Sequence, residues 1–253
     1  MKIYLTHLYP KEMSIYGDFG NILAMQYMLV QMGIEYEYQT VEIDQALPVK
    51  TDFYFIGGGQ DKEQLIIYKD LLEKKDELTK DLTNGVCMLA ICGGYQLLGQ
   101  KFLTGNGEVI PGLNILPITT TAPDNNVNSR CVGNLVIDCS IKELRGIKLV
   151  GFENHSGQTF FIQPKNNTQP LGTVIRGYGN NSTQKLEGCV WKNTIGTYLH
   201  GSCLPKNPEL TRWFINQMLK TKGVDITFNT TNEINNNTKI ANLAKSAIYE
   251  KFQ

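Results

Sequence analysis

The sequence lacks a net charge and lacks any long apolar run. Its 253 residues carry 24 Lys plus Arg against 24 Asp plus Glu, so the overall charge does not favour a nucleic-acid partner or an acidic membrane surface. No stretch approaches the roughly 18 apolar residues of a membrane span. The start, MKIYLTHLYP, has only a short apolar run and no cleavage site of a secretory signal. We therefore expect a cytoplasmic protein with no nucleic-acid partner and no membrane span.

Patterned cysteines and a nucleotide-binding loop are also absent. The six cysteines form no CxxC pair and no dense framework, which predicts free thiols and no metal site. Three glycines at 57–59 are not followed by the lysine and hydroxyl residue of a GxxxxGK[ST] phosphate loop. We recognise no other nucleotide site and expect no cofactor.

What the first hundred residues do contain is an alternation of buried and amphipathic runs. The pattern predicts strands at 2–9, 35–43, 52–59 and 86–91, and helices at 18–33, 62–85 and 94–102. Such a βαβα order indicates an α/β fold with a mostly parallel sheet flanked by helices. Ligands sit at the carboxyl ends of strands in these sheets, and both glycine clusters fall there.

The second half of the chain differs from the first. It is rich in strand-like runs from about residue 113 to 197, broken by polar loops at 122–130 and 163–170, and an amphipathic helix is predicted at 208–221. An asparagine-rich link at 229–238 leads to a last predicted helix at 239–252. We expect one domain over residues 1–221, with residues 222–253 appended to it.

Cys92 stands between a buried run and two glycines, in VCMLAICGGYQLLGQ (86–100). One interpretation is a core cysteine beside a simple turn. The other is a nucleophile on a strand-to-helix elbow, where a helix N-terminus favours the thiolate and glycine neighbours let substrate approach. On that second interpretation, the Gly93 N–H is a candidate oxyanion donor, with a second donor from Gly58 or Gly59.

A cysteine nucleophile needs a base, and the chain has only three histidines. His7 lies on the first predicted strand, so we expect a structural role. His155 and His200 both have polar or glycine neighbours, and spacing alone does not choose between them.

Four motifs together resemble the class I, triad-type glutamine amidotransferases: IGGGQD (56–61), AICGGYQLLG (90–99), GFENH (151–155) and GTYLHG (196–201). The resemblance is greatest for the branch shared with cobyric acid synthase. Within that branch, YGDFGN (16–21), GGGQDKEQ (57–64) and GTYLHGSCLPKNPEL (196–210) resemble the glutaminase subunits of bacterial lipid II isoglutaminyl synthases. It covers about residues 1–220 and implies a flavodoxin-like domain.

The resemblance implies roles for single residues. Cys92 matches the nucleophile, His200 the general base, and Arg130 the arginine that holds the substrate L-glutamine, since a guanidinium binds a carboxylate bidentately. Without the resemblance, Arg130 could equally be a solvated loop residue. Gln96 is either a contact of the bound glutamine or a residue of the helix surface.

One position departs from the class I pattern, in which a glutamate follows the histidine by two residues. Here the corresponding position is Ser202 or Cys203, and no acid follows before Glu209. The alternatives for the group that orients His200 are a backbone carbonyl, Glu153 or an acid of another chain. Asp18 and Asn21 are expected to cap the helix at 18–33.

The resemblance also implies a partner. A chain that releases ammonia but cannot activate an acceptor needs a synthetase, and in this branch that is a MurT-like, ATP-using Mur-ligase subunit that converts the D-glutamate of lipid II to D-isoglutamine. Two alternatives remain: an amidotransferase of cobyrinic or cobyric acid synthesis, and a non-catalytic relative that regulates a ligase.

Overall fold

Strands and helices alternate in the first part of the chain, as the apolar pattern predicts. The computed structural model describes residues 1–123, 130–162 and 167–224. Its first elements are β1 (Lys2–Leu8), α1 (Gly20–Gln31), β2 (Glu35–Val41), β3 (Phe53–Ile56), α2 (Asp61–Glu73), α3 (Lys75–Thr83), β4 (Cys87–Ile91) and α4 (Gly93–Leu98).

The later elements are mainly short strands. They are β5 (Lys101–Leu103), β6 (Val109–Pro111), β7 (Ile118–Thr121), β8 (Cys131–Cys139), β9 (Lys148–His155), β10 (Gln158–Phe161), β11 (Thr168–Gln169), β12 (Gly172–Arg176), β13 (Leu186–Glu187), β14 (Cys189–Trp191) and β15 (Thr194–Thr197). A 3₁₀ turn, η2 (Lys142–Leu144), follows β8, and the described part closes with α5 (Cys203–Lys206) and α6 (Pro208–Thr221).

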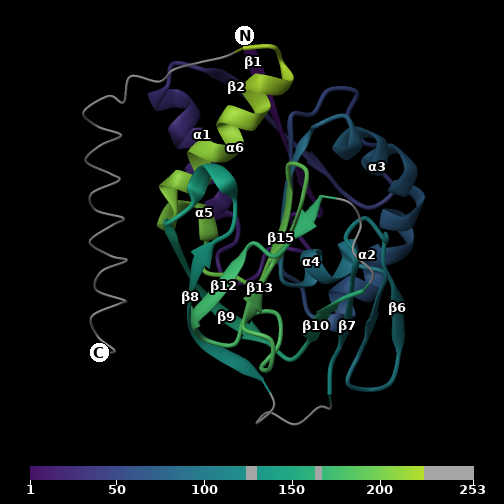
Figure 1. The fold of residues 1–253 in the computed structure, drawn as a ribbon. Helices are drawn as coiled ribbons and strands as arrows, with labels where there is room; N and C mark the ends of the chain where they lie inside the picture. The colour runs from purple at the N-terminus through teal and green to yellow at the C-terminus, as the bar shows by residue number, and fades with distance from the viewer. Residues whose placement is uncertain (124–129, 163–166, 225–253) are drawn as a thin grey trace.

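The main sheet has a parallel centre. Among the described residues it contains seven strands in the order β11-β14-β15-β4-β3-β1-β2, and every pair from β15 to β2 is parallel. All five residues of β4 are buried, as expected for a central parallel strand covered on both faces. Figure 1 shows α1, α5 and α6 grouped on one side of the molecule and α2 and α3 on the other.

Two smaller sheets form the second half. One has the order β10-β7-β5-β6 and the other β13-β12-β8-β9, and most of their pairs are antiparallel. They agree with the predicted antiparallel, strand-rich second half. An isolated bridge between Phe152 of β9 and His200 connects one of them to the end of β15, so this sheet positions the segment that carries His200.

Two predicted helices differ from the observed ones. The stretch predicted as one helix at 62–85 is interrupted at Lys74. The buried ammonium of Lys74 lies 2.5 Å from the Asp70 carboxylate. Asp70 also accepts hydrogen bonds from Tyr9 Oη and from the N–H of Asp44. The helix predicted at 94–102 ends at Leu98, and the chain turns at Gly99. Gly99 packs closely against Ile118, because a Cβ at this position would lie 2.9 Å from it.

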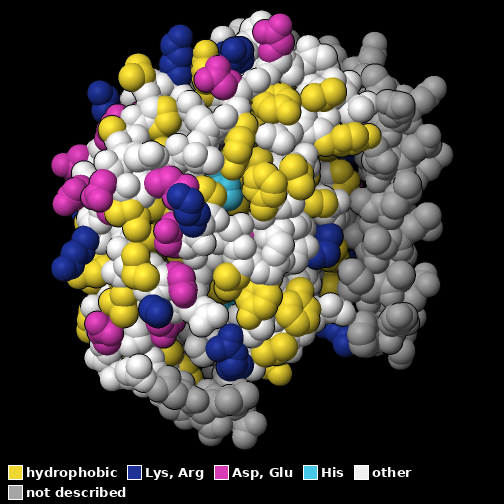
Figure 2. Space-filling model, turned by 180° about the vertical axis from the view of Figure 1, so that it is seen from behind, with side chains coloured by type: hydrophobic (Ala, Val, Ile, Leu, Met, Phe, Trp, Pro, Cys, Tyr) yellow, Lys and Arg dark blue, Asp and Glu magenta, His cyan; other side chains and the backbone are white. Residues whose placement is uncertain are grey.

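The surface agrees with the balanced composition. On the face shown in Figure 2, acidic and basic side chains are interspersed among scattered hydrophobic ones. The helices of the described residues include none that is both long and apolar enough to cross a bilayer. The predicted link at 229–238 and the predicted helix at 239–252 lie outside the described residues.

A buried asparagine fixes the segment after His200 to the sheet. Asn207 Oδ1 accepts a hydrogen bond from the N–H of Val150 on β9 at 2.9 Å, and its Nδ2 donates to the Val150 carbonyl at 2.8 Å. Nδ2 also donates to the Cys203 carbonyl at 2.7 Å. A single fully buried side chain thus holds β9 against α5 and the start of α6.

We predict that Asn207→Ala destabilises the fold by about 2–4 kcal/mol, because it leaves buried backbone groups without partners. The measurement is urea unfolding. The matched control is Asn216→Ala on α6, half-buried and without the Asn207 contacts, for which we expect a change within about 0.5 kcal/mol. Equal stability of the two variants would contradict this role of Asn207.

Candidate active site

Cys92 occupies a strained elbow between β4 and α4. Its φ of 50° and ψ of −104° are unusual for a residue with a side chain. The N–H of Cys92 donates to the Thr197 carbonyl at 2.9 Å, and the N–H of Gly94 donates to the Gly57 carbonyl at 3.2 Å. These bonds hold the elbow between β15 and the end of β3. This geometry, with the sulfur at the top of the sheet before a helix, is that of a nucleophile elbow.

The glycines around Cys92 allow two loops to approach closely. A Cβ on Gly93 would lie 2.8 Å from the carbonyl oxygen and 2.9 Å from the nitrogen of Gly59, and a Cβ on Gly94 would lie 2.9 Å from the Gly57 carbonyl oxygen. Any larger residue would displace backbone at these positions. The two glycine clusters of the sequence are therefore in direct contact, beside the sulfur of Cys92.

The amide groups of these loops differ in their partners. The N–H of Gly58 donates to Asp18 Oδ2 at 2.7 Å. Within residues 1–123, 130–162 and 167–224, no hydrogen bond uses the N–H of Gly59 or Gly93. Of the three expected oxyanion donors, Gly58 is thus engaged by a carboxylate, whereas Gly59 and Gly93 keep their N–H groups available.

His200 is fully buried and faces the N-terminal loop. Its backbone exchanges two hydrogen bonds with Phe152, at 2.8 and 3.1 Å. The ring Nδ1 lies 3.4 Å from Asp18 Oδ1, and the edge of the Tyr16 ring packs against it with 5.1 Å between centroids. His200 Nε2 has no hydrogen-bond partner in the described part of the chain. One ring nitrogen is oriented by a carboxylate and the other is free to exchange a proton.

The electrostatic environment favours a charged His200. Burial acts to lower its pKa, but the negative charge of Cys92 and the hydrogen bond and charge of Asp18 outweigh burial and raise the pKa to about 10. The arrangement therefore stabilises the imidazolium form of His200.

Asp18 does not cap α1, contrary to the expectation from sequence. Helix α1 has no side-chain cap, and the Asp18 carboxylate instead bridges the Gly58 N–H and His200. Asn21 does not cap α1 either. Its Oδ1 accepts a hydrogen bond from the N–H of Leu204 at 2.8 Å. The YGDFGN motif contained Asp18, but only the tertiary contact reveals what the carboxylate does.

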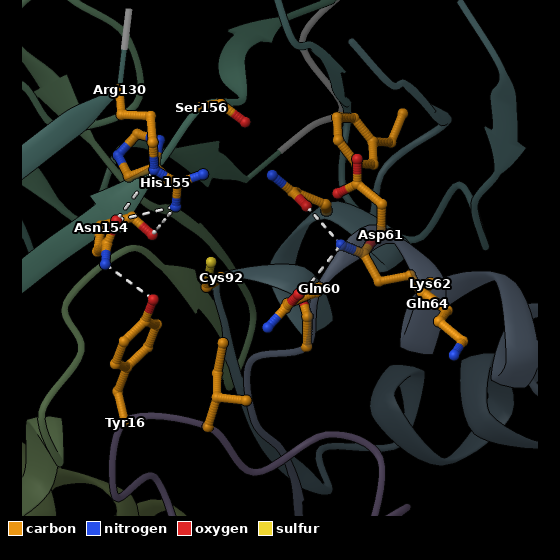
Figure 3. A pocket seen from close by; sticks show the side chains of 14 residues that line it. Tyr16, Gln60, Asp61, Lys62, Gln64, Cys92, Arg130, Asn154, His155 and Ser156 are labelled. Carbon is orange, nitrogen blue, oxygen red and sulfur yellow. Dashed lines mark hydrogen bonds between the residues drawn. The ribbon is translucent and has the colours of Figure 1, made fainter. Parts of the chain in front are cut away.

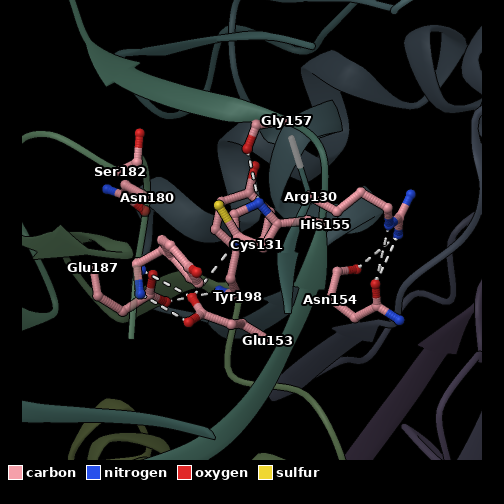
Figure 4. Close-up of polar contacts among 12 residues, drawn as sticks. Arg130, Cys131, Glu153, Asn154, His155, Gly157, Asn180, Ser182, Glu187 and Tyr198 are labelled. Carbon is pink, nitrogen blue, oxygen red and sulfur yellow. Dashed lines mark hydrogen bonds and ion pairs between the residues drawn. The ribbon is translucent and has the colours of Figure 1, made fainter. Parts of the chain in front are cut away.

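Glu153 and His155 lie in a separate buried cluster (Figure 4). Glu153 accepts the N–H groups of Tyr178 and Gly179 at 2.8 and 2.9 Å. His155 stacks on Tyr198 with 3.6 Å between ring centroids, and its Nδ1 lies 2.8 Å from the Gly157 carbonyl. Glu153 is thus committed to backbone amides and is near His155, at 3.8 Å, instead of His200.

His7 is buried on β1, as expected for a structural histidine. Its ring stacks against Phe19 and packs against Phe55, and Nδ1 lies 3.2 Å from Tyr38 Oη. Burial lowers the pKa of His7 to about 4. A neutral, packed ring at this position supports the fold and contacts no residue of the Cys92 elbow in the described structure.

A cavity of about 500 Å³ opens beside Cys92. Its walls include residues that sequence reasoning did not single out, such as Tyr16, Gln60, Asp61, Gln64 and Asn154. They come from three of the motifs found in the sequence, which are far apart in the chain: YGDFGN for Tyr16, GGGQDKEQ for Gln60, Asp61 and Gln64, and GFENH for Asn154. Figure 3 shows Cys92 between two walls, with Asn154 and His155 on one side and Asp61 and Gln64 on the other.

Arg130 lines the same cavity as Cys92. Its Nη2 and Nε donate to Asn154 Oδ1 at 2.8 and 3.2 Å, and Asn154 Nδ2 donates to Tyr16 Oη at 2.8 Å. The guanidinium is therefore held in place by an amide, and within residues 1–123, 130–162 and 167–224 it forms no ion pair. Such a group can bind a carboxylate that enters the cavity.

Gln96 is also a wall residue of the cavity and is 4% exposed. Its Oε1 accepts a hydrogen bond from Gln64 at 3.0 Å, and its Nε2 donates to Tyr198 Oη at 3.2 Å. Of the two interpretations from sequence, the helix-surface one does not hold, because both polar atoms of Gln96 are tied into the wall.

Comparison with known proteins gives relatives for the whole described domain. The family model of the CobB/CobQ-like glutamine amidotransferase domain matches residues 4–208. The chain is 37% identical to lipid II isoglutaminyl synthase (glutamine-hydrolyzing) subunit GatD of Staphylococcus aureus, over 87% of this chain and 86% of that protein. It is 38% identical to the subunit of the same name from Streptococcus pneumoniae, over 88% and 83%.

More distant similarity extends to other amidotransferases. A probable cobyric acid synthase of Methanothermobacter thermautotrophicus is 31% identical over 59% of this chain, which is only 30% of that protein. Among solved structures, PurLQS of Thermotoga maritima superposes with a TM-score of 0.56 at 12% identity, covering 87% of this chain and 99% of that chain. The glutaminase domain of Trypanosoma brucei CTPS with bound acivicin gives 0.53 at 11%, covering 89% and 96%. These structural likenesses concern the fold, and they confirm the predicted class I amidotransferase-like architecture.

The motifs identified in the sequence, the elbow at Cys92 and the family match thus agree with one another. The match extends over most of the chain and includes all four motifs. The chain therefore belongs to the CobB/CobQ-like glutamine amidotransferase family.

Proposed function

We propose that this chain is a glutaminase subunit that hydrolyses L-glutamine through a thioester on Cys92 and supplies the ammonia to an ATP-dependent ligase. One observation carries the proposal: Cys92 projects from a strained elbow beside a buried His200, whose far nitrogen lies 3.4 Å from Asp18. Nucleophile, base and orienting acid are the three parts of a catalytic triad.

The first half of the reaction forms the thioester. The Cys92 thiolate attacks the side-chain carbonyl carbon of glutamine, and the carbonyl oxygen takes up the negative charge. The N–H groups of Gly59 and Gly93 stabilise that oxyanion, each such donor contributing roughly 2.7–4 kcal/mol in acyl-transfer enzymes. His200 then donates its Nε2 proton to the nitrogen, the C–N bond breaks, and ammonia leaves.

The second half regenerates the enzyme. His200, now neutral, takes a proton from a water molecule, and the resulting hydroxide attacks the thioester carbonyl. The C–S bond breaks, glutamate leaves, and the thiolate and imidazolium are restored. Asp18 keeps the proton of His200 on Nδ1 throughout, because its carboxylate is held by Gly58 and lies next to that nitrogen.

Residues of the cavity walls bind the substrate in this proposal. Arg130 binds the α-carboxylate of glutamine as a guanidinium fork, and Gln96 contributes to the wall facing the substrate. Gly58 has a positioning role in this proposal, because its N–H is engaged by Asp18.

The ligase partner follows from the relatives and from the sequence. Two relatives of similar length are named as glutamine-hydrolyzing subunits of lipid II isoglutaminyl synthase, and this sequence contains no phosphate-binding loop. We therefore assign the chain to a heterodimer with a MurT-like, ATP-using Mur-ligase subunit. The complex amidates the D-glutamate of lipid II to D-isoglutamine, and this chain contacts lipid II only through its partner.

The alternatives have less support. This chain spans only 30% of the cobyric acid synthase relative named above, whereas it spans more than four fifths of the two subunits. A purely regulatory role would not require the strained Cys92, the contact of His200 with Asp18 or the open cavity. Residues 1–221 form the amidotransferase domain in this proposal, with residues 222–253 as an appendage.

We predict that the glutamine analogue 6-diazo-5-oxo-norleucine labels Cys92 and none of the other five cysteines. Cys87, Cys131, Cys139, Cys189 and Cys203 are buried, and burial raises the pKa of each of their thiols. Peptide mass spectrometry identifies the labelled residue. Labelling elsewhere, or full activity of Cys92→Ser, would exclude the proposed nucleophile.

We predict that Asp18→Asn lowers kcat for glutamine hydrolysis about 10³- to 10⁴-fold, as loss of the orienting acid does in a serine triad. His200→Ala should lose at least as much, and His155→Ala less. Ammonia release is measured for the chain alone and with its ligase partner. Full activity of Asp18→Asn in the complex would mean that the partner, or another group, supplies the acid.

We predict that Arg130→Ala raises KM for glutamine by about 10- to 100-fold with a smaller effect on kcat, because a charge-assisted bond to the substrate is lost. Arg130→Lys restores charge without the fork and should recover only part of the affinity. Steady-state kinetics over a range of glutamine concentrations test this. An unchanged KM in Arg130→Ala would remove Arg130 from the substrate site.

A further inference from the structure

The cavity beside Cys92 contains a carboxylate that the proposed chemistry does not use. Asp61 is the first residue of α2 and lines the same cavity as Cys92 and Arg130. In the described part of the chain, Asp61 takes part in no ion pair. A half-buried acid that faces a binding cavity without a cationic partner is a candidate ligand-binding group.

Arg130 and Asp61 form no ion pair with each other in the described part of the chain. Arg130 is tied to Asn154 on one wall, while Asp61 projects from the other wall, with Cys92 between them in the view of Figure 3. Asp61 is the first residue of α2, whereas Arg130 lies directly before β8. The separation leaves one negative and one positive group facing the same space.

We propose that Asp61 binds the α-ammonium group of glutamine, while Arg130 holds the α-carboxylate and Cys92 faces the side-chain amide. This inference rests on the proposed glutaminase function and adds the residue that selects a free amino acid. A zwitterionic α-amino acid presents one positive and one negative group on a single carbon, which matches the two unpaired charges of the cavity. The amide end of the same molecule then points to the nucleophile.

The pKa of Asp61 depends on its burial and on the charge of Arg130. Burial raises the pKa of Asp61, and the positive charge of Arg130 acts against that rise. An ammonium group arriving in the cavity adds a second positive charge and favours the ionised carboxylate further. Lys62, the other charged wall residue on α2, is exposed and has the wrong sign for an ammonium group.

The role defines a substrate class. A glutamine residue within a peptide, or an N-acylated glutamine, has no α-ammonium group and leaves Asp61 buried without a partner when bound. Such unpaired buried groups give strong discrimination against analogues that lack the matching group. Asp61 thus confines hydrolysis to free glutamine and protects glutamine side chains of peptides from the Cys92 thiolate.

Two glutamine analogues separate the Asp61 role from the Arg130 role. Glutaramate lacks the α-ammonium group, and 4-aminobutanamide lacks the α-carboxylate. For the unaltered chain we expect kcat/KM, measured as ammonia release, to favour glutamine over glutaramate by about 10- to 100-fold, the range of a hydrogen bond to a charged group. Asp61→Asn should remove this preference by lowering kcat/KM for glutamine but not for glutaramate. It should lower kcat/KM for 4-aminobutanamide as well, because that analogue keeps the ammonium group, so the preference for glutamine over 4-aminobutanamide should remain.

Matched variants complete the test. Glu73→Gln makes the same charge change at an exposed position of α2 outside the cavity, and should alter neither ratio. Asp61→Glu keeps the charge and should retain part of the preference over glutaramate. Equal loss of kcat/KM for glutamine and glutaramate in Asp61→Asn would assign Asp61 a structural role and overturn the inference. Absence of ammonia release by the folded, unaltered chain with its partner would instead contradict the proposed function.

Discussion

The close contact between two glycine-containing loops is the constraint on which the rest of the site depends. Gly93 and Gly94 pack against the backbone of Gly57 and Gly59 with no room for a Cβ. This contact fixes the elbow at the end of β4 against the end of β3, so that Cys92 keeps a positive φ that it would otherwise leave. The strain is sustained because neighbouring strands of a parallel sheet hold both loops.

Asp18, in the loop before α1, adds a negative charge to the site. Asp18 is 182 residues from His200 in sequence, yet its carboxylate joins that histidine to the amide of Gly58. One acid thereby contacts both the histidine ring and the glycine loop beside Cys92. Ser202 and Cys203 follow His200 in the sequence, so the carboxylate that lies next to its ring comes from the loop before α1.

The cavity walls come from both halves of the fold. The parallel sheet and its helices supply Cys92 and Asp61, whereas the antiparallel second half supplies Arg130 and Asn154. The position of the cavity agrees with the general rule that ligands sit at the carboxyl ends of parallel strands. The bridge from Phe152 to His200 and the bonds of Asn207 keep the two parts in register.

The sequence alone was enough to predict the architecture and the family. Apolar runs located the strands, the predicted helix at 208–221 has the observed bounds of α6, and the motifs around Cys92 and His200 indicated the family. These features are local, because a strand, a turn or a motif is encoded by neighbouring residues. Only the tertiary structure showed the contacts of Asp18 and Gln96, the position of Asp61 in the cavity wall and the break at Lys74. Each of these depends on a contact between segments far apart in the chain, where burial and charge, and not local pattern, set what a side chain does.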